Sequence, residues 1–341
     1  MTANQLDTPF AIKGLHLKNR IVMAPMCQYS VEAKDGKPND WHFVHYVSRA
    51  VGGTGLIIME MTDVDPDGRI TDYDLGLWSD EHILAFKRII DEAHRQGAKI
   101  GIQIAHAGRK AEDAEMPVGP SGIPAGLQAK TPRPLAAEEI AVIVEQFKEA
   151  AARAVKAGAD TIEIHGAHGY LIHQFHSPGI NDREDEYGQN YAKFGVEVIR
   201  AMKSVMPADM PLLFRISATE YMDGGYGVAH AIEMSKQYIA AGVDVLHVSS
   251  GGEGPAGKRK PGNYPGYQVP FARAMKEALG VPVIAVGMLD DPKLAEATVA
   301  NGDADLVAVA RGMLRDPYWA LHAIKAVKGD AEPPKAYVRA Y

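Results

Sequence analysis

One short segment of the sequence combines the end of a helix, a turn and a strand: Ala157-Gly158-Ala159-Asp160-Thr161-Ile162-Glu163-Ile164-His165-Gly166-Ala167-His168-Gly169-Tyr170. Apolar residues recur every three to four positions over residues 136–158, which predicts an amphipathic helix that closes at Ala157-Gly158. The apolar run at 161–164 has the length of a buried strand. Because this run ends abruptly in polar residues, we expect the strand to deliver them into a cleft.

This helix–turn–strand unit recurs along the chain. Ala241-Gly242-Val243-Asp244 and Gly302-Asp303-Ala304-Asp305 repeat the same turn, each directly before an apolar run. Eight such runs are present, at residues 21–24, 56–59, 100–104, 161–164, 212–216, 245–248, 283–286 and 306–310. No Gly-x-Gly-x-x-Gly motif follows the first run. The pattern therefore favours an α/β fold of the (β/α)8 class, a TIM barrel, over an open doubly wound sheet.

The chain is expected to form one domain over residues 1–341. Barrels of this class routinely reach about 250 residues or more as one unit, and no linker rich in Pro, Gly or Ser divides the sequence. A long irregular excursion at 119–134 follows the third strand. In a barrel, such an excursion usually lies near the mouth of the active site.

Composition excludes several classes of function. The net charge of −7 argues against nucleic-acid binding, and the one basic cluster, Lys258-Arg259-Lys260, is expected to be a solvated loop. No apolar run approaches the roughly 20 residues that a membrane helix requires. Cys27 is the single cysteine, and residues 1–7 lack the features of a signal peptide. We expect a cytoplasmic protein that acts on small molecules.

The barrel makes a specific prediction about polar residues, because the carboxyl ends of its strands converge on the face that carries the active site. The candidates at these ends are Cys27 and Tyr29 after the first strand, Gln103 in the third, His165, His168 and Tyr170 after the fourth, and Arg215 in the fifth. We expect these side chains to face one cleft.

Glycine-rich turns follow the last three strands, at Ser249-Ser250-Gly251-Gly252, Gly287 and Arg311-Gly312. Such turns with an arginine beside them form the usual phosphate cradle of this fold, so a phosphate-bearing cofactor is expected. Arg215 would otherwise be a buried, unpaired charge, which is costly. The alternative partner for Arg215 is a neighbouring acid such as Glu163.

The two histidines after the fourth strand have alternative interpretations. A metal site would need a third ligand, for which Cys27 or His106 could serve, but no metal-binding spacing is present and we expect no metal. Two imidazole donors aimed at one oxygen, with the Tyr170 phenol to give a proton, better fit polarisation of a carbonyl followed by proton transfer. Cys27 is equally compatible with a small buried hydrophobe and with a functional thiol.

The motifs of the chain resemble those of one family, the old yellow enzymes, which are FMN-dependent ene-reductases, and in particular its thermophilic-like branch of NADPH dehydrogenases. The matching segments are residues 19–30, 68–71, 103–110, 165–170, 177–178, 181–183, 214–217, 264–269, 310–311 and 314–317. Together they cover essentially the whole chain.

The resemblance implies FMN as cofactor and NADPH, or NADH, as reductant. By this resemblance the flavin would be lined by Ala24, Pro25, Met26, Cys27 and His165, its ring would be hydrogen-bonded by Gln103 and Arg215, and its phosphate would be held by Gly287, Ala310 and Arg311. Cys27 would tune the flavin potential and touch the ligand.

The resemblance also implies the substrate contacts. His165 and His168 would bind the carbonyl oxygen of an enone, enal, maleimide or quinone-like acceptor, Tyr170 would donate the proton, and Tyr29 would add a phenol contact. Arg339, in the tail at 330–341, would complete the pocket of a neighbouring subunit in a homodimer or homotetramer.

Two departures from the family pattern leave local geometry open. The segment 185–191 is shorter than usual, and Met61 stands where a small residue near the flavin is more common. Two other functions remain as alternatives. One is a lyase or isomerase of a phosphorylated metabolite, for which Lys110 is the only lysine near a strand end. The other is a flavin-binding protein without activity.

Overall fold

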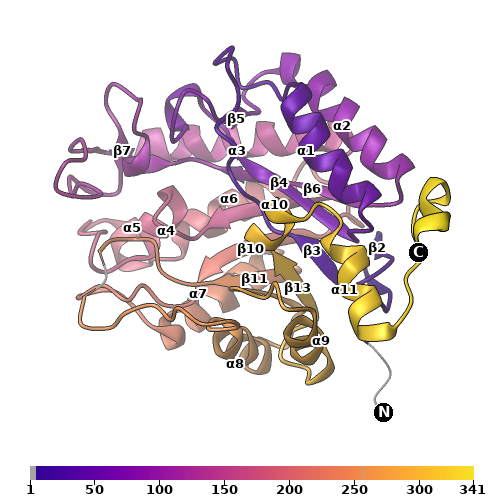
Figure 1. Cartoon of the computed structure of the whole chain (residues 1–341). Helices are drawn as coiled ribbons and strands as arrows, with labels where there is room; N and C mark the ends of the chain where they lie inside the picture. Colours follow the sequence, from indigo (N-terminus) through magenta and orange to yellow (C-terminus); the bar gives the residue numbers. More distant parts are fainter. Residues whose placement is uncertain (1–4, 256) are drawn as a thin grey trace.

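The computed structural model describes residues 5–255 and 257–341 and shows a closed barrel of eight parallel strands (Figure 1). In order around the barrel these strands are β3 (Ile21–Met23), β13 (Leu306–Val309), β12 (Val283–Val286), β11 (Val245–Ser249), β10 (Leu212–Ser217), β9 (Thr161–Gly166), β6 (Lys99–Ala105) and β4 (Leu56–Asp63), and β4 pairs with β3 to close the ring. The predicted TIM barrel is confirmed, and each of the eight apolar runs forms one of its strands.

Helices surround the strands, as Figure 1 shows. They are α1 (Asp40–Val51), α2 (Ile83–Arg95), α3 (Ala137–Ala157), α4 (Leu171–His176), α5 (Glu186–Gln189), α6 (Lys193–Lys203), α7 (Val228–Ala241), α8 (Val269–Leu279), α9 (Pro292–Ala300), α10 (Arg311–Arg315) and α11 (Trp319–Lys328). Helix α3 matches the predicted one and ends at Gly158, whose φ of 93° is readily adopted by glycine. Within the described ranges, no helix is both long and apolar enough to span a membrane.

The repeated turn places an aspartate that clamps two neighbouring strands. Asp160, Asp244 and Asp305 stand just before β9, β11 and β13. Their carboxylates accept the backbone N–H at or near the start of the adjacent strand, from Ile100, Leu212 and Val283, each over 2.9 Å. Each aspartate thus supplies an acceptor to a backbone N–H at or near the start of the adjacent strand and links the two strands there.

An antiparallel hairpin covers the amino-terminal end of the barrel. It consists of β1 (Phe10–Ile12) and β2 (Leu15–Leu17). Leu15 and Leu17 pack with Val22, Leu56 and other inward-facing residues of the barrel strands. The barrel is thus sealed at this end, and polar chemistry is confined to the opposite end.

Strand β4 is longer than the predicted run at 56–59. It continues to Asp63 through an irregularity between Met59 and Met61, and the short strand β5 (Leu75–Gly76) pairs with its end. A bulge of this kind redirects the side chains that follow it. Met61 is buried there, in the apolar cluster against which Cys27 packs.

The excursion and the segment 185–191 are both ordered by local contacts. Within the excursion, β7 (Val118–Gly119) pairs with β8 (Arg133–Pro134) and closes it into a loop. In the shortened segment, Asp185 caps helix α5 by accepting the N–H of Tyr187, and the same carboxylate pairs with Arg183. The shortening therefore still permits a short, capped helix.

Candidate active site at the carboxyl ends of the strands

His165, His168 and Tyr170 come together where β9 ends. The ring centroid of His165 lies 4.8 Å from that of Tyr170 and 5.3 Å from that of His168. The chain reaches this geometry through two left-handed residues, His168 with a φ of 59° and Gly169 with a φ of 80°. This conformation is costly for a residue with a Cβ atom, so surrounding contacts must hold His168 in place.

The two imidazoles are neutral and the phenol is protonated. Burial, followed by the charge of Arg215, lowers the pKa of both His165 and His168 well below the ordinary value. The N–H of Ala167 donates to Nδ1 of His165 over 3.2 Å, which leaves the ring proton on Nε2. Burial raises the pKa of Tyr170 well above its ordinary value. This phenol therefore keeps a proton to donate.

A serine from another strand contacts His168. Oγ of Ser249, at the end of β11, lies 2.7 Å from Nε2 of His168. The Ser249 hydroxyl is also placed to donate to Oε1 of Gln268 over 3.4 Å, and the same oxygen accepts from Ser250 over 2.5 Å. A hydroxyl has one proton, so Ser249 either donates to Gln268 and accepts from Nε2–H of His168, or donates to Nε2 and leaves the ring proton of His168 on Nδ1. The second arrangement leaves Nδ1–H available to a ligand.

Cys27 and Tyr29 lie beside the same rings, in the segment after β3. Cys27 is half-buried and packs, with Tyr170, against the cluster that contains Met61. Burial, followed by the charge of Glu60, raises the pKa of Cys27 well above its ordinary value, so the residue is a thiol. Tyr29 lies close enough to this thiol for the two groups to shift each other's pKa values. Cys27 is therefore a partly accessible residue of the site rather than an enclosed core residue.

A buried carboxylate supports this segment. Oε1 of Glu60 accepts the N–H of Gln28 over 2.9 Å, and Oε2 accepts the hydroxyl of Tyr46 over 2.6 Å. Burial nevertheless raises the pKa of Glu60 to about 8. Protonation of Glu60 would therefore alter its hydrogen bond with the backbone N–H of Gln28, the residue next to Cys27.

Among the cavities on this face of the barrel, two border the predicted site residues. The outer cavity, of about 600 Å³, is lined by Tyr29, Ile70, Arg109, Lys110, Ala111, Glu112, Ala125, Gly126, Gln128, Ala129, Lys130 and Tyr170. The inner cavity, of about 170 Å³, is lined by Arg215, Ser249, Tyr267, Gln268, residues 286–290, Ala308, Ala310 and Arg311. Residues of the excursion thus form part of the outer wall, beside the two tyrosines.

The inner cavity fits a phosphate-bearing cofactor. Gly287 has a φ of 130°, a conformation that favours glycine, and it lies in the wall with Ala310 and Arg311. Nε of Arg215 is buried and has no hydrogen-bond partner among the described residues. A buried N–H without an acceptor is unusual in a native protein, so this donor is consistent with a cofactor atom as its partner.

The alternative ion pair between Arg215 and Glu163 is wrong. Oε1 of Glu163 accepts Nε2 of Gln103 and its Oε2 faces Nδ1 of His247, each over 2.8 Å. No ion pair of Arg215 is found within the ranges that the structure describes. Gln103 is buried in the barrel, with its amide nitrogen committed to Glu163.

The glycines after β11 lie on the histidine side rather than in the inner cavity, which corrects one part of the predicted cradle. A Cβ atom on Gly252 would meet Cα of His168 at 2.5 Å. Lys110 joins the same two segments, since its Nζ donates to the carbonyl oxygens of His168, over 2.7 Å, and of Gly252. This lysine is engaged by backbone carbonyls, which removes the support for a Schiff-base lyase.

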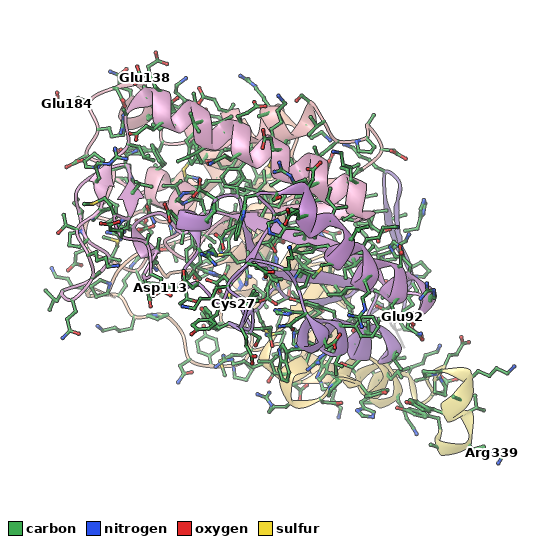
Figure 2. All side chains as sticks on the ribbon, turned by 90° about the horizontal axis from the view of Figure 1, so that it is seen from above. Cys27, Glu92, Asp113, Glu138, Glu184 and Arg339 are labelled. Atoms are coloured by element: carbon green, nitrogen blue, oxygen red, sulfur yellow. The ribbon has the colours of Figure 1, made fainter. Side chains whose placement is uncertain are left out.

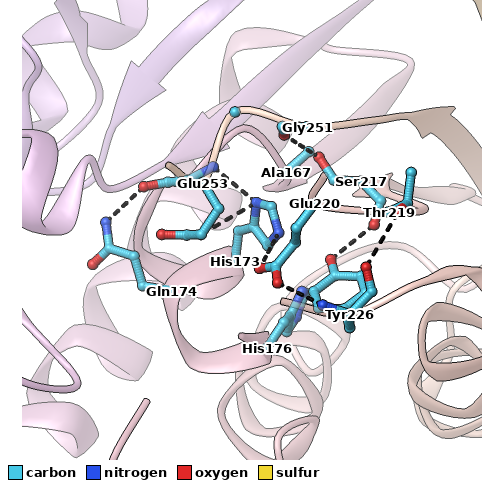
Figure 3. A network of polar contacts seen from close by, with 12 residues as sticks. Ala167, His173, Gln174, His176, Ser217, Thr219, Glu220, Tyr226, Gly251 and Glu253 are labelled. Atoms are coloured by element: carbon cyan, nitrogen blue, oxygen red, sulfur yellow. Dashed lines mark hydrogen bonds and ion pairs between the residues drawn. The ribbon is translucent and has the colours of Figure 1, made fainter. Parts of the chain in front are cut away.

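A buried polar cluster behind the histidines was missed in the sequence. His173 on α4 lies between Glu220, after β10, and Glu253, after β11 (Figure 3). Each of the three offers a ligand atom within 4.8 Å of the others, a grouping of the type that can hold a metal ion. The sequence carries no signal for it, because the three residues lie on separate segments without a metal-binding spacing.

The remaining predicted residues divide into two groups. Ala24 and Pro25 are buried directly after β3, and Met26 is half-buried beside them. Arg339 is exposed in the 3-10 helix Lys335–Ala340, at the far edge of the molecule from Cys27 (Figure 2). Within one chain, therefore, Arg339 does not reach the site.

Comparison with known proteins identifies relatives over the whole chain. The model of the NADH:flavin oxidoreductase / NADH oxidase family matches residues 5–329. An NADPH dehydrogenase of Bacillus subtilis (strain 168) is 47% identical over 342 residues, which cover 99% of this chain and 100% of that protein.

Solved structures give the same picture. Morphinone reductase is 28% identical with a TM-score of 0.81, and the match covers 98% of this chain and 92% of that one. A 2-naphthoyl-CoA reductase in complex with 2-naphthoyl-CoA is 26% identical with a TM-score of 0.89, and the match covers 96% of this chain and 52% of that longer one.

Proposed function

This chain belongs to the NADH:flavin oxidoreductase / NADH oxidase family, and from that membership we propose that it reduces the carbon–carbon double bond of α,β-unsaturated carbonyl compounds. It is an FMN-dependent oxidoreductase of the NADPH dehydrogenase type, related to the old yellow enzymes. A nicotinamide nucleotide is its reductant, as the solved complex of morphinone reductase with tetrahydroNAD illustrates for a relative.

One observation carries the proposal: two neutral imidazoles and a protonated phenol share one face at the end of β9. Nε2–H of His165 is one uncharged donor, and Nδ1–H of His168 would be the second when Ser249 donates to Nε2 of that ring. Such donors suit a carbonyl oxygen that gains negative charge during reduction, because they stabilise the charge without transferring a proton to it. Tyr170 can then protonate the α-carbon.

FMN, when bound, carries hydride from the nicotinamide to the β-carbon of the acceptor. The residues that would hold its phosphate are Gly287, Ala310 and Arg311, which line the inner cavity. The buried N–H of Arg215 would face the flavin ring, and Gln103, whose amide nitrogen is used by Glu163, would offer its carbonyl oxygen to a ring N–H. Ala24, Pro25, Met26 and Cys27 would lie along the ring.

The acceptor would lie between the histidines and the outer cavity. Its carbonyl oxygen would accept from His165 and His168, and its substituents would extend past Tyr29 and Tyr170 toward the excursion at 119–134. The Cys27 thiol and the Tyr29 hydroxyl would contact the ligand from the β3 side. The volume of the outer cavity, about 600 Å³, favours acceptors with a substituent beyond the reacting double bond.

Two features of the assembly belong to the same proposal. Residues 1–341 would act as one flavin-binding domain, and the tail at 330–341 would dock on a second copy in a homodimer or homotetramer. Arg339, exposed at the far edge, would then supply a cation to the neighbouring site. The exposed Tyr337, Val338 and Tyr341 beside it would supply apolar contact area.

The decisive experiment is an anaerobic visible absorption spectrum of the purified holoenzyme before NADPH, after NADPH and after 2-cyclohexenone. We expect a flavin spectrum that bleaches with NADPH and returns with the enone. Flavin that bleaches but stays reduced with the enone would refute ene reduction while leaving the family assignment intact. The variant His165→Ala/His168→Ala is the matched control, because it should still bleach with NADPH.

A further inference from the structure

The strained turn that carries His168 and Tyr170 is held on both sides of Gly169 by side chains of α4. The N–H of Gly169 donates to Nδ1 of His173 over 2.8 Å, and its carbonyl oxygen accepts Nε2 of Gln174 over 2.8 Å. The N–H and the carbonyl oxygen of Gly169 are therefore both held by side chains of α4. Together with the bond from Lys110 to the carbonyl oxygen of His168, these two bonds hold the left-handed turn at His168 and Gly169.

His173 is in turn fixed between two carboxylates (Figure 3). Its Nε2 lies 3.2 Å from Oε1 of Glu220, and its Nδ1 lies 3.4 Å from Oε2 of Glu253. Glu220 also accepts the N–H of Tyr226 over 2.8 Å, and Glu253 accepts Nη2 of Arg109 over 2.7 Å. His173 and both glutamates are fully or almost fully buried, with exposed fractions of 0%, 1% and 0%.

The donors determine which nitrogen of His173 carries the proton. A backbone N–H can only donate, so Nδ1, which faces Gly169, must present its lone pair. The ring proton is then on Nε2, which lies 3.2 Å from Oε1 of Glu220 without forming a hydrogen bond of good geometry. The bond from the N–H of Gly169 alone therefore determines the tautomer of His173.

The same geometry argues against a metal ion in the cluster. A cation on Nδ1 would displace the N–H of Gly169, and one on Nε2 would lie on the side of the ring away from Glu253, which faces Nδ1. Glu253 is moreover already neutralised by Arg109.

We propose that His173, as the Nε2–H tautomer, is a positioning residue that holds Gly169 and thereby aims His168 and Tyr170 at the acceptor. The inference deepens the proposed ene-reductase function and rests on it. His173 does not touch the acceptor in this role. It acts through the turn, and its loss should affect acceptor binding and reoxidation far more than FMN content or flavin reduction by NADPH.

Three substitutions separate this role from packing. In His173→Asn, Oδ1 replaces Nδ1 as the acceptor for the N–H of Gly169. In His173→Gln, the amide reaches Glu220, but no acceptor remains near the N–H of Gly169. His173→Leu removes both functions. His176→Asn is the matched control, because His176 is an equally buried residue of α4 that bonds Tyr238 over 2.6 Å and not the turn.

The test measures, on each holoenzyme, FMN content, the dissociation constant of a phenol from the oxidised flavin, and the two half-reaction rates. We expect His173→Gln and His173→Leu to weaken phenol binding and slow reoxidation by about 10- to 100-fold, the usual cost of losing an orienting residue. In His173→Asn and in the His176→Asn control, both quantities should stay within about threefold of the wild-type values, since neither variant removes the acceptor for the N–H of Gly169. Equal losses in Asn and Gln would overturn the proposal.

Measurements on the wild-type holoenzyme cover the case in which the variants do not fold. The ¹⁵N chemical shifts of the His173 ring should show an unprotonated Nδ1 and a protonated Nε2, and protonation of both nitrogens would overturn the proposal. Stoichiometric Zn²⁺ that is lost in Glu220→Gln would overturn it in favour of a metal site. A wild-type enzyme that ignores enones would refute the proposed function, whereas the ring shifts would still report on the turn.

Discussion

Oγ of Ser249 lies 2.7 Å from Nε2 of His168, although the two residues stand on different strands of the barrel. His168 follows β9 and Ser249 ends β11, and β10 separates the two strands. If this hydroxyl donates to Nε2, the ring proton lies on Nδ1, so we infer that a residue outside the histidine motif determines which nitrogen of His168 would donate to a ligand.

Substitution of Ser249 should therefore weaken ligand binding without removing the histidine. In Ser249→Ala, His168 can adopt either tautomer, and we expect phenol affinity to fall about 2- to 10-fold, the cost of one net hydrogen bond. Titration of the oxidised flavin with a phenol measures this. Ser250→Ala is the control, since Ser250 bonds Gln268 and not His168. An unchanged dissociation constant in Ser249→Ala would contradict the tautomer assignment.

Removal of both imidazoles should abolish carbonyl polarisation. In His165→Ala/His168→Ala we expect phenol binding to be lost and enone reduction to slow by about 10²- to 10³-fold, as when preorganised donors to a developing oxyanion are removed. FMN content and flavin bleaching by NADPH should persist. Stopped-flow measurement of the two half-reactions distinguishes these effects, and normal turnover with enone would rule out the assigned role.

Tyr170→Phe should separate the two half-reactions. The substitution keeps the ring that packs near His165 but removes the proton donor. We expect reoxidation by an enone to slow about 10²-fold or more, within the range for a lost general acid, with little change in flavin reduction. Reoxidation by an acceptor that needs no carbon protonation, such as a quinone, should be nearly unaffected. Equal slowing with both acceptors would exclude a proton-donor role.

Glu60 should make stability depend on pH. Its pKa is about 8 in the fold and near 4.5 when the chain is unfolded, so the folded state binds the extra proton between these values. Stability from this group is complete below pH 4.5 and is lost as the pH rises toward 8. The melting temperature of Glu60→Gln, relative to that of the wild type, should therefore rise from pH 5 to pH 9. A pH-independent difference would contradict the raised pKa.

The aspartate clamps should contribute to global stability. In Asp244→Ala the N–H of Leu212 loses its acceptor, and we expect unfolding to become easier by about 1–3 kcal/mol. Asp244→Asn keeps an acceptor oxygen and should cost less. Denaturant unfolding compares the two variants. Equal destabilisation would show that the ion pair with Lys13, rather than the strand clamp, is what matters.

The sequence predicts much of this architecture for a physical reason. A strand buried on both faces is mostly apolar, so the eight barrel strands stand out as short apolar runs. Where buried polar residues interrupt the run the signal fails, and the prediction ends β4 at Met59, before Glu60 and Thr62. The predicted limit of the last strand at Ala310 was one residue too long.

The sequence likewise predicts only part of the candidate site. His165, His168 and Tyr170 could be found because they follow a strand end directly. The cluster of His173, Glu220 and Glu253 could not, because its members come from three loops or helices whose approach depends on the closed barrel. The role of Ser249 toward His168 likewise requires knowing that β9 and β11 both flank β10.

The clamping aspartates stand at the amino-terminal ends of β9, β11 and β13, whereas the histidines, the tyrosine and both cavities lie at the other end of the barrel. The residues that link the strands and the residues that would select a ligand thus lie at opposite ends of the barrel. Mutations in the loops around the outer cavity can therefore change which ligands the proposed site would admit, while the aspartates at the other end keep the strands linked.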